Sequence, residues 1–262
     1  MSGGHAHAGS GSVVGRLFVH GHSLVHRLAP EVKVVAVFGF VVTVALTPRE
    51  RVPAFAVYAA AMVAVMLLSH LPVRVVLTRL AVVLPFVTFA VLVPFIGGGE
   101  QTRVLGMELS VDGLWATWNI LAKAVLGASA SIVLSATTPV PDLLRGLTRM
   151  RVPKVMVAIV AFMVRYLDLL VEQLGRMRTS MTARCHDPRW LWQVKPIASS
   201  AGALFVRSYE RGERIHQAML ARGYSGVMPA LDDRRATARE WATAAVLPVV
   251  AVATLTVTTV IA

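Results

Sequence analysis

Two short segments of the chain place an arginine in nearly the same setting. One reads Met-Thr-Ala-Arg-Cys over residues 181–185, and the other reads Met-Leu-Ala-Arg-Gly over residues 219–223. The residues of interest are Ala183, Arg184, Cys185, Ala221, Arg222 and Gly223. A planar guanidinium can donate paired hydrogen bonds to a carboxylate, which suits docking into an acidic groove of another protein. The alternative interpretation is that each arginine complements a helix dipole and that Gly223 caps the helix.

Each arginine ends a long segment with helical periodicity. The first segment begins as an apolar stretch over residues 155–164. Apolar residues then recur every three or four positions over residues 163–181 and again over residues 197–219, while charged residues fall on other faces. In the second segment Glu210 and Arg214 are four apart with the acid first, a spacing that supports an exposed helix. The pattern therefore predicts two amphipathic helices, the second of which ends at Gly223.

The other residue types that could do chemistry do not form a recognisable site. Five of the eight histidines crowd the beginning of the chain, namely His5, His7, His20, His22 and His26. Imidazole suits cobalt, nickel or zinc, but this spacing is not that of a closed metal site. A solvated tail is the default interpretation and a metal-binding tail is the alternative, so we assign no metal ligand.

Catalytic motifs are absent from the sequence as well. No Gly-x-x-x-x-Gly-Lys-Ser/Thr segment is present to cradle nucleotide phosphates, and neither a zinc-protease helix nor a nucleophile elbow occurs. We therefore expect no enzyme activity and no cofactor in this chain. Cys185 is the single cysteine, so no intrachain disulfide can form.

The composition indicates a membrane protein. Hydrophobic residues make up 56% of the 262 positions, and the mean hydropathy is +0.65. The net charge of +12 could suggest nucleic acid, but aromatic residues for base stacking are only 7% of the chain. Basic loops on the cytoplasmic side of a membrane explain the charge better. The expected fold class is all-α and polytopic.

The apolar runs divide the chain into four regions. The expected spans are 32–46, 53–71, 80–96, 114–136 and 241–261. Residues 155–171 could form one more, so the count is five or six. We expect a tail and lead-in segment over residues 1–31, transmembrane helices over 32–137, a basic cytoplasmic region over 138–239 and a last transmembrane helix over 240–262.

Charge in the loops sets the expected orientation. The connection at 97–113 is acidic, whereas the loop with Arg74 and Arg79 and the region 138–239 are basic. These alternate consistently if the N-terminus is cytoplasmic. Lys123 lies inside the fourth span and needs a partner or a route to an interface.

The second helical segment resembles a known family. Residues 204–224, Leu-Phe-Val-Arg-Ser-Tyr-Glu-Arg followed by Ala-Met-Leu-Ala-Arg-Gly-Tyr, look like the transmembrane (T) component of energy-coupling factor (ECF) transporters, most closely the cobalt-type CbiQ branch. Further similar pieces lie at 26–33, 144–154 and 164–166, so the resemblance covers most of the chain. Within 26–33 the sequence departs from the family pattern, with Ala29 where an acid is expected and Glu31 where a base is expected.

The resemblance implies a function. In that family the T component is a scaffold whose coupling helices end in two Ala-Arg-Gly motifs, and each arginine rests in a groove of one subunit of an ABC-type ATPase pair. Arg222 matches fully, whereas Arg184 is followed by Cys185 in place of glycine. The implied partners are those ATPases, a CbiM-like substrate-binding membrane subunit and the lipid bilayer of the cell membrane.

The cargo stays open at this stage, because another subunit sets selectivity in this family. Cobalt or nickel fits the branch, a vitamin importer is the alternative, and a self-sufficient carrier is an alternative of another class.

Overall fold

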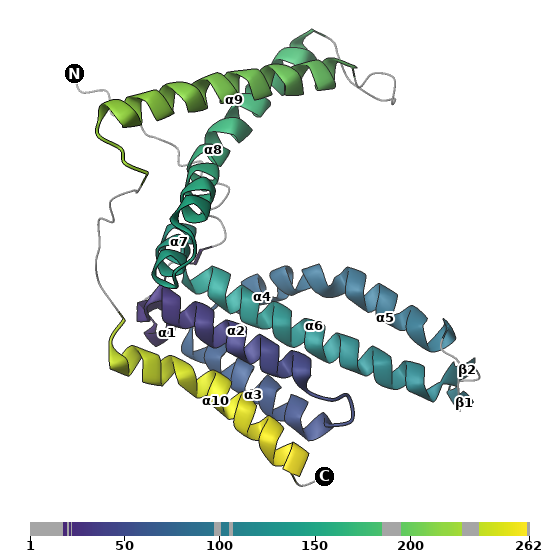
Figure 1. Ribbon diagram of the computed structural model, residues 1–262. Helices are drawn as coiled ribbons and strands as arrows, with labels where there is room; N and C mark the ends of the chain where they lie inside the picture. The colour runs from purple at the N-terminus through teal and green to yellow at the C-terminus, as the bar shows by residue number, and fades with distance from the viewer. Residues whose placement is uncertain are drawn as a thin grey trace, which may run out of the picture. The chain divides into compact units, whose positions relative to one another are not determined.

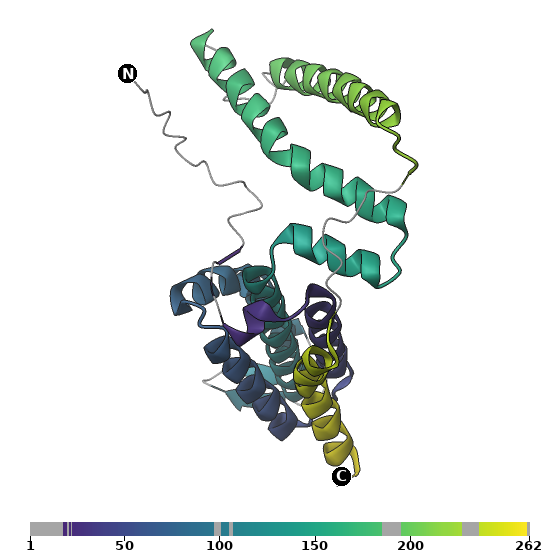
Figure 2. The ribbon, with the colours of Figure 1, turned by 90° about the vertical axis from the view of Figure 1, so that its left-hand side faces the viewer.

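The computed structural model describes residues 18–96 other than 20 and 22, together with 101–104, 107–184, 195–226 and 236–260. The chain divides into two compact units. Leu17–Arg149 and Arg234–Ala262 form one of them, which we call the helical bundle. Met150–Asp233 belongs to the other, and its described helices form what we call the two-helix unit. Figures 1 and 2 show the helices of each unit from two directions.

The helical bundle contains the apolar helices. Its elements are α1 (Leu24–Arg27), α2 (Pro30–Leu46), α3 (Val52–Leu68), α4 (Val73–Leu80), the 3-10 turn η2 (Ala81–Val83), α5 (Leu84–Ile96), α6 (Val111–Thr137), α7 (Val140–Arg149) and α10 (Ala238–Val260). Pro30 begins α2 at a position where its missing N–H costs nothing, and Ser110 caps α6 by accepting from the Gly113 N–H at 3.3 Å.

Among the described residues, three helical stretches are long and apolar enough to cross a membrane: Val73–Phe95, Val111–Thr137 and Ala238–Val260. The apolar helices α2 and α3 each have 17 residues, or about 25 Å at 1.5 Å per residue, close to the ~30 Å thickness of a hydrocarbon layer. The predicted all-α, multi-pass membrane fold is confirmed. Helix α8 (Lys154–Ala183), which covers the alternative sixth span, is not among these candidates.

The core of the bundle lies where α2, α3, α6 and α10 meet. Phe40 and Tyr58 are completely buried and pack edge to face, with ring centroids 6.1 Å apart. The Tyr58 hydroxyl donates to the carbonyl oxygen of Ala251 at 3.3 Å and lies 3.2 Å from the Thr47 hydroxyl. Satisfied polar groups of this kind are required in an apolar environment, where an unpaired one costs several kcal/mol.

Lys123 finds the partner that its position in a span requires. Its Nζ donates to the carbonyl oxygen of Ala45 at 2.8 Å. Ala45 lies in the last turn of α2, where backbone carbonyls have no partner within the helix. The lysine therefore complements the negative end of α2.

The connection between α5 and α6 contains a hairpin that the sequence pattern does not predict. Strands β1 (Gln101–Val104) and β2 (Met107–Ser110) pair antiparallel, with Gln101 opposite Ser110. At this end of the bundle Arg49 and Asp112 form an ion pair at 3.0 Å. The two strands are too short and too polar to show a clear alternating pattern.

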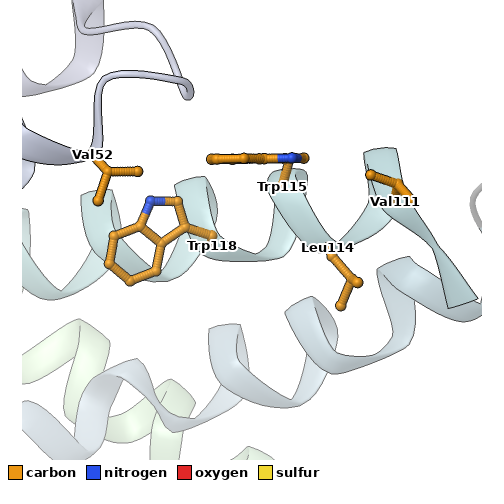
Figure 3. Close-up of a pocket in the computed structure, with 5 residues that line it drawn as sticks. All are labelled: Val52, Val111, Leu114, Trp115 and Trp118. Carbon is orange, nitrogen blue, oxygen red and sulfur yellow. The ribbon is translucent and has the colours of Figure 1, made fainter. Parts of the chain in front are cut away.

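Tryptophans lie near both ends of the bundle helices. Trp115 and Trp118 lie in the first turns of α6, where they line an open apolar hollow with Val52, Val111 and Leu114 (Figure 3). Trp241 lies in the first turn of α10. Tryptophan is enriched at the two membrane–water interfaces, so these positions are consistent with a membrane-spanning bundle.

The two-helix unit consists of α8 and α9 (Lys195–Ala221), whose described parts have little core of their own. No residue of α8 is buried, and its apolar side chains are largely exposed. The predicted pair between Glu210 and Arg214 is present in α9, and Glu172 and Arg176 form a similar pair in α8. Both amphipathic helices are thus confirmed.

Candidate functional site

Helix α9 ends in a Schellman motif built around Gly223. The N–H of Tyr224 donates to the carbonyl oxygen of Met219, and the N–H of Gly223 donates to that of Leu220, both at 3.0 Å. Gly223 has φ +80°, a left-handed conformation that glycine adopts at no steric cost. The motif ends the helix abruptly and leaves Arg222 exposed just before the turn.

Helix α8 ends differently. Arg184 is its C-cap residue, with φ −92° and ψ 19°, and its N–H donates to the carbonyl oxygen of Met181 at 3.1 Å. Unlike Gly223, Arg184 does not have a left-handed backbone conformation. Cys185, which stands in place of the expected glycine, lies outside the described residues. Arg184 is exposed, like Arg222.

Both guanidinium groups are available to another molecule. Within residues 18–184, 195–226 and 236–260, apart from the gaps given above, neither Arg184 nor Arg222 forms an ion pair or a side-chain hydrogen bond. Other arginines of these helices are occupied, since Arg176 pairs with Glu172 and Arg214 with Glu210. A guanidinium without an internal partner retains its full set of donors for a carboxylate.

The two arginines do not form a single site. The Ser200 hydroxyl lies 3.7 Å from the sulfur of Met181, so the last turn of α8 lies beside the early part of α9. Arg222 follows Ser200 by enough residues to place it about 33 Å further along α9, at 1.5 Å per residue. The two arginines therefore lie at two separate points of the two-helix unit.

A known protein family matches most of this chain, including both exposed arginines. The CbiQ family, described as cobalt transport protein, matches residues 21–231. The chain belongs to the CbiQ family. It is 34% identical over 141 residues to the cobalt transport protein CbiQ of Rhodobacter capsulatus, covering 51% of this chain and 57% of that one. The CbiQ-family chain thus spans about half the length of this relative.

Other relatives match over different lengths. The energy-coupling factor transporter transmembrane protein EcfT of Bacillus selenitireducens is 30% identical over 237 residues, covering 82% of this chain and 85% of that one. A putative fused cobalt transport protein CbiMQ of Methanocorpusculum labreanum is 24% identical over 145 residues, covering 53% of this chain and 24% of that one. The similarity to ECF T components therefore extends over most of the CbiQ-family chain.

The histidines do not assemble a metal site in the described part of the CbiQ-family chain. There, no group of three or more His, Cys, Asp or Glu side chains lies close enough together to hold an ion. His26 Nε2 donates to the carbonyl oxygen of Val19 at 3.1 Å, and its Nδ1 lies 2.7 Å from the Ser23 hydroxyl. His26 thus stabilises the start of α1, while His5, His7, His20 and His22 lie outside the described residues.

Sequence reasoning missed two buried charges at the start of α2. Glu31 and Lys33 are each only 6% exposed, and both make contacts with distant parts of the bundle. The sequence alone could have indicated that these two charges need partners, because a charge within an apolar span is costly unless it is paired. Arg149 and Thr137, which pair with Glu31 and Lys33, were not predictable as partners, since they lie more than one hundred positions away in the sequence.

The turn at Gly223 leads to a first prediction. Gly223→Ala should loosen the last turn of α9, because a left-handed conformation costs an alanine roughly 1–2 kcal/mol, while no atom within 4 Å opposes the added Cβ. We expect the Gly223-region amides to exchange about 5–30 times faster in hydrogen-exchange mass spectrometry. Gly212→Ala in the same helix also meets no atom within 4 Å and serves as the control. Equal exchange in both variants would contradict the role of the motif.

Proposed function

We propose that this chain is the transmembrane coupling scaffold (T component) of an ATP-driven ECF-type importer. The observation that carries the proposal is the pair of exposed arginines, Arg184 and Arg222, at the ends of two long helices. Neither pairs with another side chain in the described part of the chain. In our proposal each guanidinium docks into an acidic groove of one subunit of an ABC-type ATPase pair, together with Ala183 and Cys185 or with Ala221 and Gly223. ATP hydrolysis then belongs to those subunits and not to this chain.

The exposed apolar side chains of the two helices support a protein partner. On α8 Val155, Met163 and Leu167 are exposed by 65%, 65% and 39%, and on α9 Phe205 is exposed by 72%. Large apolar patches of this kind mark interaction surfaces in proteins that otherwise bury such groups. Helix α8 is not among the candidate membrane spans, and Arg165, Asp168 and Glu172 interrupt its apolar stretch, so lipid alone does not account for its exposed face.

The proposed mechanism is mechanical coupling. ATP binding closes the two ATPase subunits, and the docked helices α8 and α9 move with them. The movement shifts the helical bundle against a separate substrate-binding membrane subunit, so that the cargo reaches the cytoplasm. A ligand can drive such a change only if it binds one of the two states more tightly, and here that ligand is ATP in the partner subunits.

The proposed location is the cell membrane, with the N-terminus and the two-helix unit in the cytoplasm. Arg74 and Arg79 lie in α4, and basic residues recur through the two-helix unit. Asp112 lies with the hairpin at the opposite end of α6 from Thr138. The excess of arginine and lysine on one side favours this orientation.

Cobalt is the cargo we propose, with nickel as the closest chemical alternative. The CbiQ relative is named for cobalt transport, and the fused CbiMQ relative joins a CbiM part to a CbiQ part in one chain. A CbiM-like membrane subunit is therefore the proposed substrate-binding partner. The EcfT relative, whose similarity covers 82% of this chain, has no metal in its name. A T component of an ECF vitamin importer is therefore the second candidate.

Affinity purification in mild detergent tests the proposal. The tagged chain should retain an ABC-type ATPase pair and a small membrane subunit. In liposomes, the complex should transport labelled Co²⁺ only when ATP is present on the side of the membrane that carries the ATPase subunits. Uptake by the chain alone would establish a self-sufficient carrier instead. Retention of a vitamin-binding membrane subunit in place of a CbiM-like one would favour the second candidate.

A further inference from the structure

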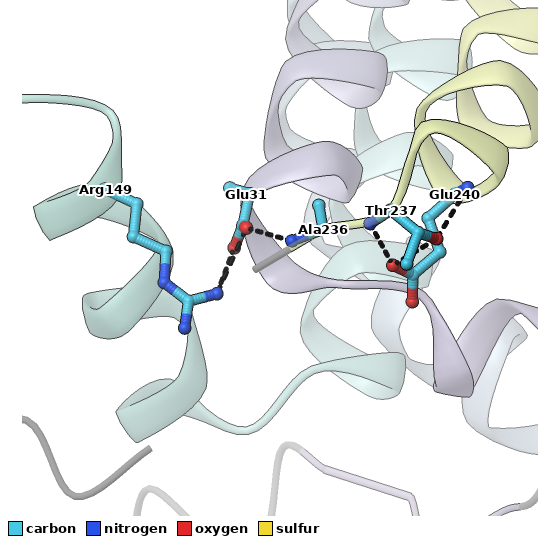
Figure 4. Close-up of polar contacts among 5 residues, drawn as sticks. All are labelled: Glu31, Arg149, Ala236, Thr237 and Glu240. Atoms are coloured by element: carbon cyan, nitrogen blue, oxygen red, sulfur yellow. Dashed lines mark hydrogen bonds and ion pairs between the residues drawn. The ribbon is translucent and has the colours of Figure 1, made fainter. Parts of the chain in front are cut away.

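One buried carboxylate holds together three segments of the helical bundle. Glu31, in the first turn of α2, accepts from the guanidinium of Arg149 at 3.1 Å and 3.2 Å through its two oxygens. Its Oε1 also accepts from the backbone N–H of Ala236 at 3.3 Å. Figure 4 shows Arg149 and Ala236 reaching the carboxylate from opposite sides. Both oxygens of this 6%-exposed residue are thus occupied by donors from distant parts of the chain.

The two donors lie at the two ends of the segment Met150–Asp233, which contains the two-helix unit. Arg149 is the last residue of α7 and the last residue of the bundle before the chain continues into Met150–Asp233. The chain returns to the bundle at Arg234, and Ala236 follows two positions later. A single side chain therefore contacts both covalent connections through which the two-helix unit is joined to the bundle.

A second charge in the same turn holds the other end of α7. Lys33 Nζ donates to the carbonyl oxygen of Thr137 at 3.1 Å and to the Thr138 hydroxyl at 3.2 Å, at the corner between α6 and α7. Between the two ends, α7 approaches α2 closely at Gly146, where an added Cβ would lie 2.9 Å from the Glu31 backbone nitrogen. Helix α7 is therefore fixed to the first turn of α2 along its length.

The returning connection is equally well defined. Thr237 and Glu240 form a capping box, in which the Thr237 N–H donates to Glu240 Oε2 at 2.7 Å and the Glu240 N–H donates to the Thr237 hydroxyl at 3.4 Å (Figure 4). Helix α10 thus starts at a rigid turn directly after the residue that Glu31 holds. Displacement of this connection would move α10 with it.

We infer that Glu31 is the positioning residue through which displacement of the two-helix unit reaches the membrane helices. It acts by clamping the outgoing connection, through Arg149, and the returning connection, through Ala236, to α2. The inference rests on the proposed function, because only a coupling scaffold has such a displacement to transmit. It assigns Glu31 no contact with cargo or nucleotide.

The test uses the full transporter complex in liposomes. It measures separately the binding of the ATPases and the amount of Co²⁺ taken up per ATP hydrolysed. Glu31→Ala should leave the ATPases bound and ATP hydrolysis within twofold of wild type, because Arg184 and Arg222 are untouched. Uptake of Co²⁺ per ATP hydrolysed should fall at least tenfold. The swap Glu31→Arg with Arg149→Glu should recover part of the coupling, because it restores the ion pair to α7 but leaves Ala236 without an acceptor.

Hydrogen exchange provides a readout independent of transport. Glu31→Ala should speed exchange both in residues 140–149 and in residues 236–240, whereas Arg149→Met should do so only in the first range. Should Glu31→Ala not yield a monodisperse complex, Arg149→Met and the swap still report on the α7 half of the clamp. Gly127→Ala, which meets no atom within 4 Å, is the neutral control.

The outcomes separate this inference from the proposed function. A wild-type chain that binds no ATPase would refute the proposed function. A coupled wild-type complex whose Glu31→Ala and Arg149→Met variants import cargo with unchanged stoichiometry would refute the inference alone. Loss of ATPase binding in Glu31→Ala would also refute it, since the residue would then support docking rather than transmission.

Discussion

Replacing Arg184 and Arg222 together by alanine is expected to abolish ATP-driven uptake and to release the ATPase subunits from the purified complex. In the proposed complex, each substitution would leave a carboxylate of the partner without its counter-charge, which typically costs about 2–5 kcal/mol at an interface. That cost corresponds to a loss of roughly 30-fold or more in affinity per site. Pull-down in mild detergent and uptake of labelled Co²⁺ into liposomes measure the two effects.

The single variants and a matched control make this prediction sharper. Arg222→Lys keeps the charge but loses the planar fork, so we expect weaker ATPase retention than in wild type. Arg214→Ala removes an exposed arginine of the same helix that already pairs with Glu210 at 3.9 Å, and it should leave the complex intact. An unaffected uptake rate in the double alanine variant would show that both arginines only complement their helix ends.

The helices of this protein were predictable because periodicity and apolar runs are local. The expected span over residues 114–136 and the observed α6 (Val111–Thr137) nearly coincide, and both long amphipathic helices are present. The exposed end of α9 also follows from local pattern, because Gly223 marks a left-handed turn. The hairpin between α5 and α6 was not predictable, since its strands have four residues each.

Contacts between distant segments were beyond the reach of the sequence pattern. Glu31 stood out only as an acid where the family resemblance expects a base, and its partner Arg149 lies 118 positions away. Helix α6 contains a run of small residues, Gly-Ala-Ser-Ala-Ser over 127–131, in which Ser129 and Ala130 are buried. Gly127, within that run, nonetheless meets no atom within 4 Å. Which face of a helix meets a neighbour depends on the tertiary arrangement, and a single sequence does not encode it locally.

Helix α6 approaches α5 closely at Gly113, and Gly113→Ala is expected to destabilise the bundle strongly. An added Cβ there would lie 2.6 Å from Cα of Pro94, in α5, and 3.2 Å from the carbonyl oxygen of Val93. These are backbone atoms, so the helices must separate, and overpacking of this kind costs about 1–3 kcal/mol. A chain of this size should then lose roughly 2–4 °C of apparent Tm per kcal/mol. Thermal unfolding in detergent, followed by tryptophan fluorescence, measures the change.

Gly127→Ala is the matched control, because it makes the same substitution in the same helix. Here the added methyl group meets open space, and alanine is favoured over glycine in a helix by about 0.5–1 kcal/mol, so Tm should stay level or rise. The opposite signs exclude helix propensity as the cause of any loss at Gly113. The hydroxyl of Thr117 donates to the carbonyl oxygen of Ala90 at 2.8 Å across the same pair of helices, so their separation should also break this bond. A Gly113→Ala variant as stable as Gly127→Ala would show that α5 and α6 do not depend on this contact.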